Sequence, residues 1–347
     1  MHGSPIGIDI SDRILRLVQL DAHGSSYKVH AYHSIDLPEG LIVSGVIQDA
    51  DKVSVHLAAL VRNAKSRHAR GRAVVSVLPE RQSFIKLIQL ESMPEDRVRA
   101  EIEGSLSQHF PLTADEVYFD TQVIPDVHEG STVVLVAASP RSLVDQYVRA
   151  FRAAKLELTS LELESAAICR SVLPQVLSPE TAMLVVDVGL NRASYIMVDY
   201  TVIAYTYSSS AVSGHAMTEA LTVPLKLSYA KAEKAKRLCG LDPARGKGEV
   251  RRVLAPMVKT LEKEIRTVLS FYAEHFPFGH RVSTILLTGG AANLHLLPET
   301  LQQTLTIPVK RADPLAVLAA HGVPAEFASS AASYTTALGL ALHPTPR

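Results

Sequence analysis

Tryptophan is absent from the 347 residues, and cysteine occurs only twice, as Cys169 and Cys239. Two distant cysteines fit neither a disulfide framework nor a zinc site, which agrees with a reducing compartment. No run of about 18 apolar residues occurs, so we expect no transmembrane helix and no direct membrane insertion. Histidine is more frequent, with 14 residues, but no Cys/His cluster suggests metal ligation.

Charge of one sign is not in excess. The chain carries 35 Lys and Arg residues against 35 Asp and Glu residues. Neutralising the phosphates of a nucleic acid requires a basic excess. We therefore expect no nucleic-acid partner and no strong electrostatic attachment to lipid. The local exception, the basic stretch 65–72, is interpreted as a solvated helix end and loop.

Hydrophobic residues make up 47% of the chain, and their pattern contains an internal repeat. An apolar strand that ends in Asp is followed twice by two further strands. The first set is expected over 6–9, 14–20 and 27–37, and the second over 183–187, 194–198 and 202–207. A repeat of about half the chain length predicts two similar lobes.

A second unit is expected between the repeats, over residues 82 to about 165. Strands are predicted over 84–90, 117–124, 132–138 and 156–163. Ser92 and Glu95 have the spacing of a capping box, and Ser139-Pro140 is expected to begin another helix. The order β-α-β-β-α-β predicts a small α+β module.

The remaining chain is expected to be mainly helical around one more buried strand. Ser228 and Gly240 bound a predicted helix, and strand 282–287 precedes a Gly-Gly turn and another helix. We expect a first-lobe core over 1–80, an inserted α+β subdomain over 81–165, a helix returning to the first lobe over 166–182, a second-lobe core over 183–208 and 282–330, a helical subdomain over 209–281, and a C-terminal helix and tail over 331–347.

Asp9 and Asp187 occupy equivalent places in the repeat, each at the end of an apolar strand before a tight turn. Such a carboxylate can hold a hydrated Mg²⁺, and the turn amides can face phosphate oxygens. Gly289-Gly290 lets the backbone approach a ligand closely, and a following helix N-terminus favours anions. Either Asp alone is more often an ordinary turn residue, and the Gly-Gly motif alone is equally consistent with a tight strand-to-helix turn. The repetition of the Asp makes a nucleotide site as good an interpretation as two ordinary turns.

Several segments, taken together, carry a family resemblance. They are Leu37-Pro38-Glu39-Gly40, Gly45-Val46-Ile47, His109-Phe110-Pro111-Leu112, Ala232-Glu233-Lys234-Ala235-Lys236, Glu264-Ile265 with Phe271-Tyr272, Leu287-Thr288-Gly289-Gly290, and Ala312-Asp313-Pro314. In order and spacing they resemble the PilM family of type IV pilus assembly proteins, within the superfamily of actin, sugar kinases and FtsA. The resemblance implies an α/β, two-lobed actin-like (ribonuclease H-like) ATPase fold with an inserted small α+β subdomain.

The resemblance also implies roles at an ATP and Mg site. Asp9 and Asp187 would flank the metal through its waters, and Gly189 and Ser194 would belong to the second phosphate hairpin. Glu233 and Lys236 would reach the ribose and adenine, while Gly289 and Gly290 would back the adenosine. Without the resemblance, Glu233 and Lys236 would be interpreted as a surface ion pair, because they lie three residues apart on a helix.

The first hairpin departs from the family pattern, which usually reads Asp-x-Gly, then Ser or Thr, with a later Lys. Here Ser11 replaces the glycine, which restricts positive φ, and Asp12 adds a carboxylate where phosphate oxygens should lie. Arg16 stands at the Lys position, and Gly214 follows Ser213 where paired glycines are usual. We expect a nucleotide site that is weak, structural or lost.

Dedicated enzymatic chemistry is not indicated. The stretch from Gly240 to Gly248 resembles a P-loop, but its spacer is one residue too long and Gly248 replaces the required Ser or Thr. No nucleophile elbow or triad is evident from the sequence. Nucleotide binding, or a weak ATPase at most, is therefore the interpretation.

The resemblance implies a cytoplasmic adaptor, peripheral to the inner membrane through its partner. It would bind the N-terminal cytoplasmic peptide of a PilN-like protein, near strands 84–90 and 117–124, and contact other pilus inner-membrane and motor components. A homodimer is left open. The alternatives are a component of a type II secretion or mannose-sensitive pilus system, an FtsA-like cell-division ATPase, although residues 342–347 lack an amphipathic anchor, and a sugar kinase-like enzyme.

Overall fold

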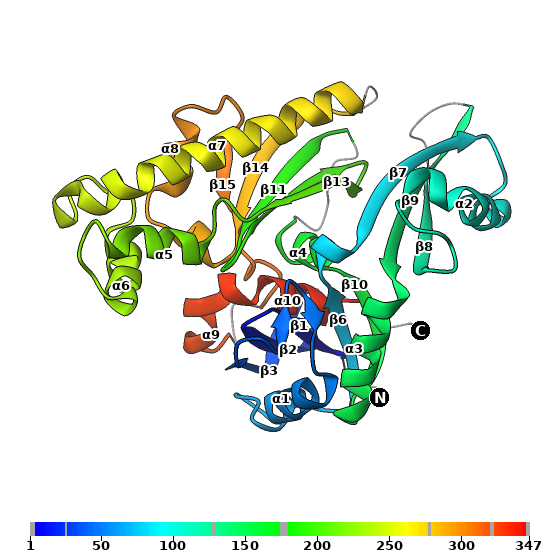
Figure 1. Cartoon of the computed structure of the whole chain (residues 1–347), viewed down its shortest axis with the longest axis horizontal. Coiled ribbons are helices and arrows are strands. Elements are labelled where there is room, and N and C mark those ends of the chain that lie inside the picture. Colours follow the sequence, from blue (N-terminus) through cyan, green and yellow to red (C-terminus); the bar gives the residue numbers. More distant parts are fainter. Residues whose placement is uncertain are drawn as a thin grey trace. The chain divides into compact units, whose positions relative to one another are not determined.

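Two five-stranded sheets carry the fold in the computed structural model, one in each of two units (Figure 1). The structure describes residues 4–24, 26–125, 130–173, 180–276, 279–319 and 323–344. Unit 1 comprises Met1–Leu173 and Pro314–Arg347, and unit 2 comprises Pro174–Asp313.

The sheet of unit 1 has the strand order β10-β6-β1-β2-β3. Its strands are β1 (Ile6–Ile10), β2 (Ile14–His23), β3 (Ser26–Asp36), β6 (Ala73–Leu78) and β10 (Glu157–Leu163). Every residue of β1 is buried, because helices cover both faces of the sheet. A Cβ on Gly7 would lie 2.4 Å from the Ala337 carbonyl oxygen, so glycine permits the close approach of the C-terminal helix α10 (Thr335–Ala341).

One apolar cluster of unit 1 includes residues of α1 (Ala50–Arg62) and α3 (Arg141–Ala153). A second includes residues of α9 (Ala325–Ser330) and α10, and α10 also contacts α4 (Glu164–Val172). Residues from Pro314 onward thus belong to unit 1, whereas the sequence pattern predicts 314–330 in the second-lobe core. The apolar side chains of β2 and β3, such as Val18 and Leu20, provide the surface on which they pack.

A smaller sheet is inserted into unit 1, with the order β7-β9-β8. It consists of β7 (Phe84–Glu91), β8 (Val117–Ile124) and β9 (Ser131–Pro140), and α2 (Glu95–His109) packs on one face. The predicted module is shorter than expected, because β10 pairs with β6 of the large sheet and α3 packs on α1. The predicted capping box is also wrong: α2 begins after Pro94, without a side-chain cap.

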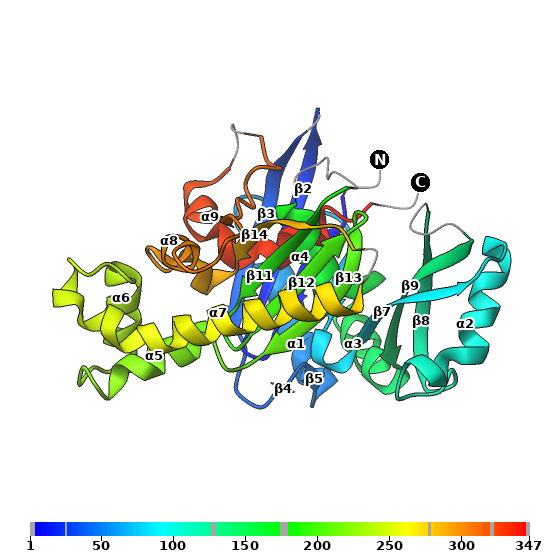
Figure 2. The same cartoon turned by 90° about the horizontal axis from the view of Figure 1, so that it is seen from above.

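In Figures 1 and 2, α2 lies on the outer side of the inserted sheet, away from α3. The short hairpin of β4 (Ile42–Val43) and β5 (Val46–Ile47) lies close to α3.

The sheet of unit 2 has the order β13-β12-β11-β14-β15. Its strands are β11 (Ala182–Val188), β12 (Ala193–Asp199), β13 (Val202–Ser209), β14 (Val282–Thr288) and β15 (Val309–Arg311). Helices α5 (Gly214–Thr222), α6 (Tyr229–Cys239), α7 (Glu249–His275) and α8 (Leu297–Gln302) accompany it. Figure 2 shows α7 lying along this sheet.

The two large sheets repeat one topology. In each, the first strand pairs antiparallel with the next strand on one side and parallel with a later strand on the other, β1 with β2 and β6, and β11 with β12 and β14. The predicted internal repeat of two similar lobes is therefore confirmed. Asp9 and Asp187 occupy equivalent positions near the end of the first strand of each repeat.

Candidate functional site

The first hairpin, between β1 and β2, brings Asp9 and Arg16 together. The two residues are directly opposed in the antiparallel ladder, and Arg16 Nη1 lies 3.3 Å from Asp9 Oδ2. Asp9 is only 5% exposed, so this is a largely buried ion pair. The carboxylate predicted to face a metal thus already has a cation beside it.

Ser11 closes the turn of this hairpin. Its backbone N–H and its hydroxyl both donate to the Ile14 carbonyl oxygen, at 3.1 and 2.8 Å. Ser11 is not among the described residues with positive φ. The expected conflict between serine and a left-handed backbone therefore does not arise, because this turn does not need one at that position.

Asp12 does not point its carboxylate toward a phosphate-binding turn. Oδ1 accepts from the Gly45 N–H at 2.8 Å and Oδ2 accepts from the Ser44 N–H at 3.1 Å. These amides lie in the turn between β4 and β5. Backbone donors elsewhere in unit 1 therefore bind the charge that the sequence pattern places beside the phosphates.

The second hairpin, between β11 and β12, holds Asp187, Gly189 and Ser194. Asp187 and Ser194 are opposed in the ladder, and the Gly189 N–H donates to the Arg192 carbonyl oxygen at 2.9 Å. Ser194 is buried and Asp187 is partly exposed. The carboxylate thus lies at the mouth of a tight turn.

The Gly289-Gly290 turn lies directly against Asp187. β14 runs parallel to β11, with Thr288 opposite Asp187, and Gly289 follows with φ of 85°. A Cβ on Gly289 would lie 2.6 Å from Asp187 Oδ1, so only glycine fits here. The chain then forms a single 3-10 turn, Gly290–Asn293, so the helix predicted after the turn, α8, begins only at Leu297.

Gly214 links the second hairpin to α6. The Gly214 N–H donates to the Gly189 carbonyl oxygen at 2.9 Å, and its own carbonyl oxygen accepts from Lys236 Nζ at 2.8 Å. Ser213 caps α5 by accepting from the Ala216 N–H. A single glycine in this loop is therefore sufficient to bring α5 against the hairpin.

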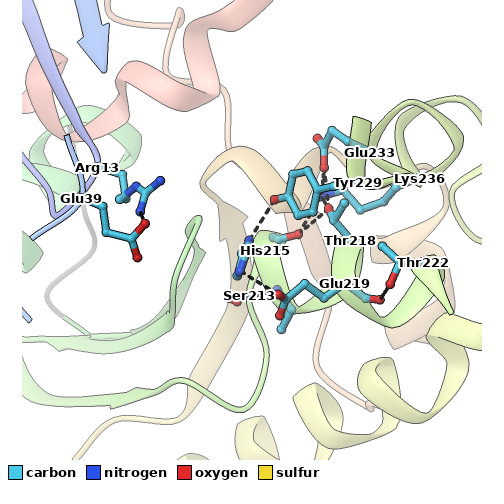
Figure 3. Close-up of polar contacts among 12 residues, drawn as sticks. Arg13, Glu39, Ser213, His215, Thr218, Glu219, Thr222, Tyr229, Glu233 and Lys236 are labelled. Carbon is cyan, nitrogen blue, oxygen red and sulfur yellow. Dashed lines mark hydrogen bonds and ion pairs between the residues drawn. The ribbon is translucent and has the colours of Figure 1, made fainter. Parts of the chain in front are cut away.

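Lys236 is buried, with 7% exposure, among oxygen atoms (Figure 3). Nζ lies 2.7 Å from Glu233 Oε2 and 2.7 Å from the Thr218 hydroxyl. The interpretation of Glu233 and Lys236 as a surface ion pair is wrong for the lysine, because α5 covers it. A buried ammonium requires this set of acceptors.

The charges in this cluster are strongly coupled. Burial acts to raise the pKa of Glu233, but hydrogen bonds from Lys236, Thr218 and Arg237 outweigh it and lower that pKa to about 2. Burial lowers the pKa of Lys236, and the ion pair with Glu233 offsets only part of this effect. Glu233 therefore stays ionised near neutral pH.

Sequence reasoning missed three residues beside this cluster: Thr218, His215 and Tyr229. His215 Nδ1 lies 2.9 Å from the Tyr229 hydroxyl (Figure 3). The backbone N–H of His215 donates to the Leu190 carbonyl oxygen. Helical spacing could have indicated two of them. Thr218 lies four residues after Gly214, and Tyr229 lies four before Glu233.

The structure thus brings the predicted residues into two groups. Unit 1 holds Asp9, Ser11, Asp12 and Arg16, and unit 2 holds Asp187, Gly189, Ser194, Gly214, Glu233, Lys236, Gly289 and Gly290. Among the residues that the structure describes, no three His, Cys, Asp or Glu side chains are placed to hold a metal ion. No helix of the same residues is long and apolar enough to cross a membrane.

Comparison with known families decides the assignment. A family model described as type IV pilus assembly protein PilM matches residues 7–345. The chain belongs to the PilM family of type IV pilus assembly proteins. The family match favours this reading over the cell-division, secretion and sugar-kinase alternatives.

Solved structures agree on the fold of this PilM-family chain. The structure named "PilM-PilN type IV pilus biogenesis complex" matches with a TM-score of 0.80 and 23% identity, over 99% of this chain and 98% of the other. Ethanolamine utilization protein EutJ from Carboxydothermus hydrogenoformans matches with a TM-score of 0.57 and 15% identity, over 97% and 89%. MreB 5 of Spiroplasma citri bound to AMPPNP matches with 0.55 and 11%, over 98% and 95%. The expected actin-like fold is confirmed.

Proposed function

We propose that this chain is a cytoplasmic adaptor of type IV pilus assembly that binds the N-terminal cytoplasmic peptide of a PilN-like inner-membrane protein. The peptide would keep the adaptor at the membrane, where other pilus inner-membrane and motor components assemble. Family membership supports the pathway, and the name of the PilM–PilN structure supports the partner. The observation that carries the binding role is the inserted sheet of unit 1.

The inserted sheet has two properties of a peptide-binding surface. In the part of the chain that the structure describes it has three strands, and β7 and β8 are its edge strands, to which an extended peptide can add a further strand. α2 packs on one face, whereas Leu87 and Leu135, paired on the opposite face, remain partly exposed. An extended peptide could add backbone hydrogen bonds at an edge and place apolar side chains on this face.

Polar groups border that face near α3. Tyr118 of β8 is 44% exposed, the Arg141 guanidinium lies 4.3 Å from its ring centre, and its hydroxyl donates to Asp145 Oδ1 at 3.3 Å. A half-exposed tyrosine with a fixed ring offers apolar area at low entropic cost. Together with Leu87 and Leu135 it forms the surface that we assign to the peptide.

Calorimetric titration with a synthetic PilN-tail peptide tests this assignment. Leu87→Lys should weaken binding by about tenfold or more, because a charge replaces an apolar contact. Ser107→Lys is the matched control: it adds the same charge at an exposed position on α2. Equal peptide affinities of Leu87→Lys and Ser107→Lys would show that the peptide does not bind this face. If the wild type binds no peptide, the adaptor proposal fails.

We also propose that the chain binds a purine nucleotide such as ATP, with Gly289 and Gly290 close to the nucleoside, Glu233 at the ribose and Asp187 toward the phosphates. The close approach of the Gly289 backbone to Asp187 supports this placement, and Lys236 would act indirectly, by holding Glu233. Magnesium, when bound, would neutralise phosphate charge, and in unit 2 the partly exposed Asp187 is a carboxylate suited to its waters. Hydrolysis would be weak at most, since no described group stands out as a catalytic base.

A further inference from the structure

The backbone of the turn between β4 and β5 has an uncommon conformation. Its two central residues, Ser44 and Gly45, have φ of 51° and 81°. Two successive left-handed residues are typical of a tight two-residue hairpin. Serine adopts this conformation only at an energetic cost, so the surrounding structure must hold the turn in place.

This turn lies at the neck of the inserted module, which we define as residues 79–83 leading into β7 and residues 139–141 leading from β9 into α3. A Cβ on Gly45 would lie 2.3 Å from the Pro79 side chain, and Gln82 Nε2 lies 3.5 Å from the Ser44 carbonyl oxygen. The buried Tyr147 of α3 donates its hydroxyl to the Gly45 carbonyl oxygen at 2.9 Å. The turn therefore contacts chain on both sides of the module.

The two connections are also joined to each other. Ser139 Oγ and Ser83 Oγ form a hydrogen bond of 2.7 Å at the base of the sheet. A displacement of the β4–β5 turn would thus act on both connections together. It would change where the module stands relative to the rest of unit 1.

Asp12 holds this turn from the first hairpin. Each of its oxygens accepts one backbone N–H, at 2.8 and 3.1 Å, and bonds from amides to a carboxylate are among the stronger ones in proteins. Asp12 is one residue beyond Ser11, whose hydroxyl closes the hairpin that begins at Asp9. One side chain thus joins the hairpin to the neck.

We propose that Asp12 is a positioning residue for the peptide-binding module: it fixes the Ser44–Gly45 turn against the neck and so sets the placement of the inserted sheet. The peptide affinity of that sheet then depends on a residue of the first hairpin. The effect on affinity rests on the proposed adaptor function, while the effect on the module itself does not.

Asp12→Ala and Asp12→Asn test the inference, with Asp51→Ala as the matched control. Asp51 is an exposed aspartate whose ion pair with Arg149 also reaches α3, but it does not hold the turn. Hydrogen–deuterium exchange of 84–91 and 131–140 should be about threefold faster or more in Asp12→Ala, because the neck is released. Exchange in α10 should not change, and Asp51→Ala should match the wild type.

PilN-tail affinity provides the second readout. Asp12→Ala should weaken it by about fivefold or more, and Asp12→Asn, which keeps one acceptor, should fall between. Unchanged exchange in the module of the Asp12 variants overturns the inference even if the peptide binds. Faster exchange with unchanged peptide affinity overturns the link to binding. If the wild type binds no peptide, the adaptor proposal fails, and exchange alone decides the role of Asp12.

Discussion

The two hairpins of the repeat have the same strand pairing but use their turn residues differently. In unit 2 the turn faces other parts of the candidate nucleotide site: Gly189 contacts Gly214, and Asp187 lies against Gly289. In unit 1 the turn residues make contacts outside that site: Ser11 closes the hairpin, and Asp12 accepts hydrogen bonds from the β4–β5 turn. A repeated topology thus does not require a repeated role, since one changed side chain can redirect a turn.

A substitution at the glycine turn beside the second hairpin should have the largest effect on ATP affinity. Gly289→Ala places a Cβ 2.6 Å from Asp187 Oδ1 in a left-handed backbone, so ATP affinity should fall by about tenfold or more. Calorimetry measures this directly. Gly40→Ala is the matched control, because Gly40 has φ of 84° with open space around its Cβ position. Equal losses in both variants would show a general backbone effect.

Removing the buried cation should destabilise unit 2. Lys236→Met leaves Glu233 with one partner fewer in a mostly buried place, at a cost of about 2 kcal/mol or more in the free energy of unfolding. Lys234→Met, at an exposed position of the same helix, should change it by less than about 0.5 kcal/mol. Urea unfolding distinguishes the two. A similar cost for both would mean that the cluster does not stabilise unit 2.

The same cluster predicts an acid dependence. The folded pKa of Glu233 is about 2, below its ordinary value of 4.5, so its stabilising contribution is present above about pH 4.5 and is lost as pH falls toward 2. The stability difference between the wild type and Glu233→Gln should therefore shrink across that interval. If the difference in unfolding free energy between the wild type and Glu233→Gln, measured by urea titration, stays constant between pH 5 and 2, the ionised Glu233 does not stabilise the fold.

Substitutions in the first hairpin should change ATP affinity less than Gly289→Ala does. Arg16→Ala removes a cation that pairs with Asp9, and ATP affinity should fall by about threefold. Asp12→Ser should change ATP affinity by less than about twofold, because the Asp12 carboxylate faces Ser44 and Gly45. A large gain in affinity for Asp12→Ser would restore the idea that this carboxylate repels phosphate.

Much of the fold followed from the sequence because strands have short, local signals. The apolar run before each Asp, the bounds of α6 at Ser228 and Gly240 and the Gly-Gly turn all depend on neighbouring residues. The strand range 117–124 is predicted with the bounds observed for β8, and the repeat predicts two lobes. The partner strand of β10 was not predictable in this way, because its pairing with β6 depends on chain folding over 80 residues of sequence.

Side-chain partners were harder to predict. The spacing of Glu233 and Lys236 indicated a shared helix face, but only the tertiary structure shows that α5 buries the lysine. Asp12 was placed correctly in the hairpin, yet its partners lie 32 and 33 residues away in a turn. No local pattern encodes such contacts.

The adaptor role is tested most directly by hydrogen–deuterium exchange of the intact chain with and without the PilN-tail peptide. We expect protection to appear in β7 and β8 of the inserted sheet, since the peptide would cover an edge and the face away from α2. Protection confined to unit 2, or none at saturating peptide, would contradict it.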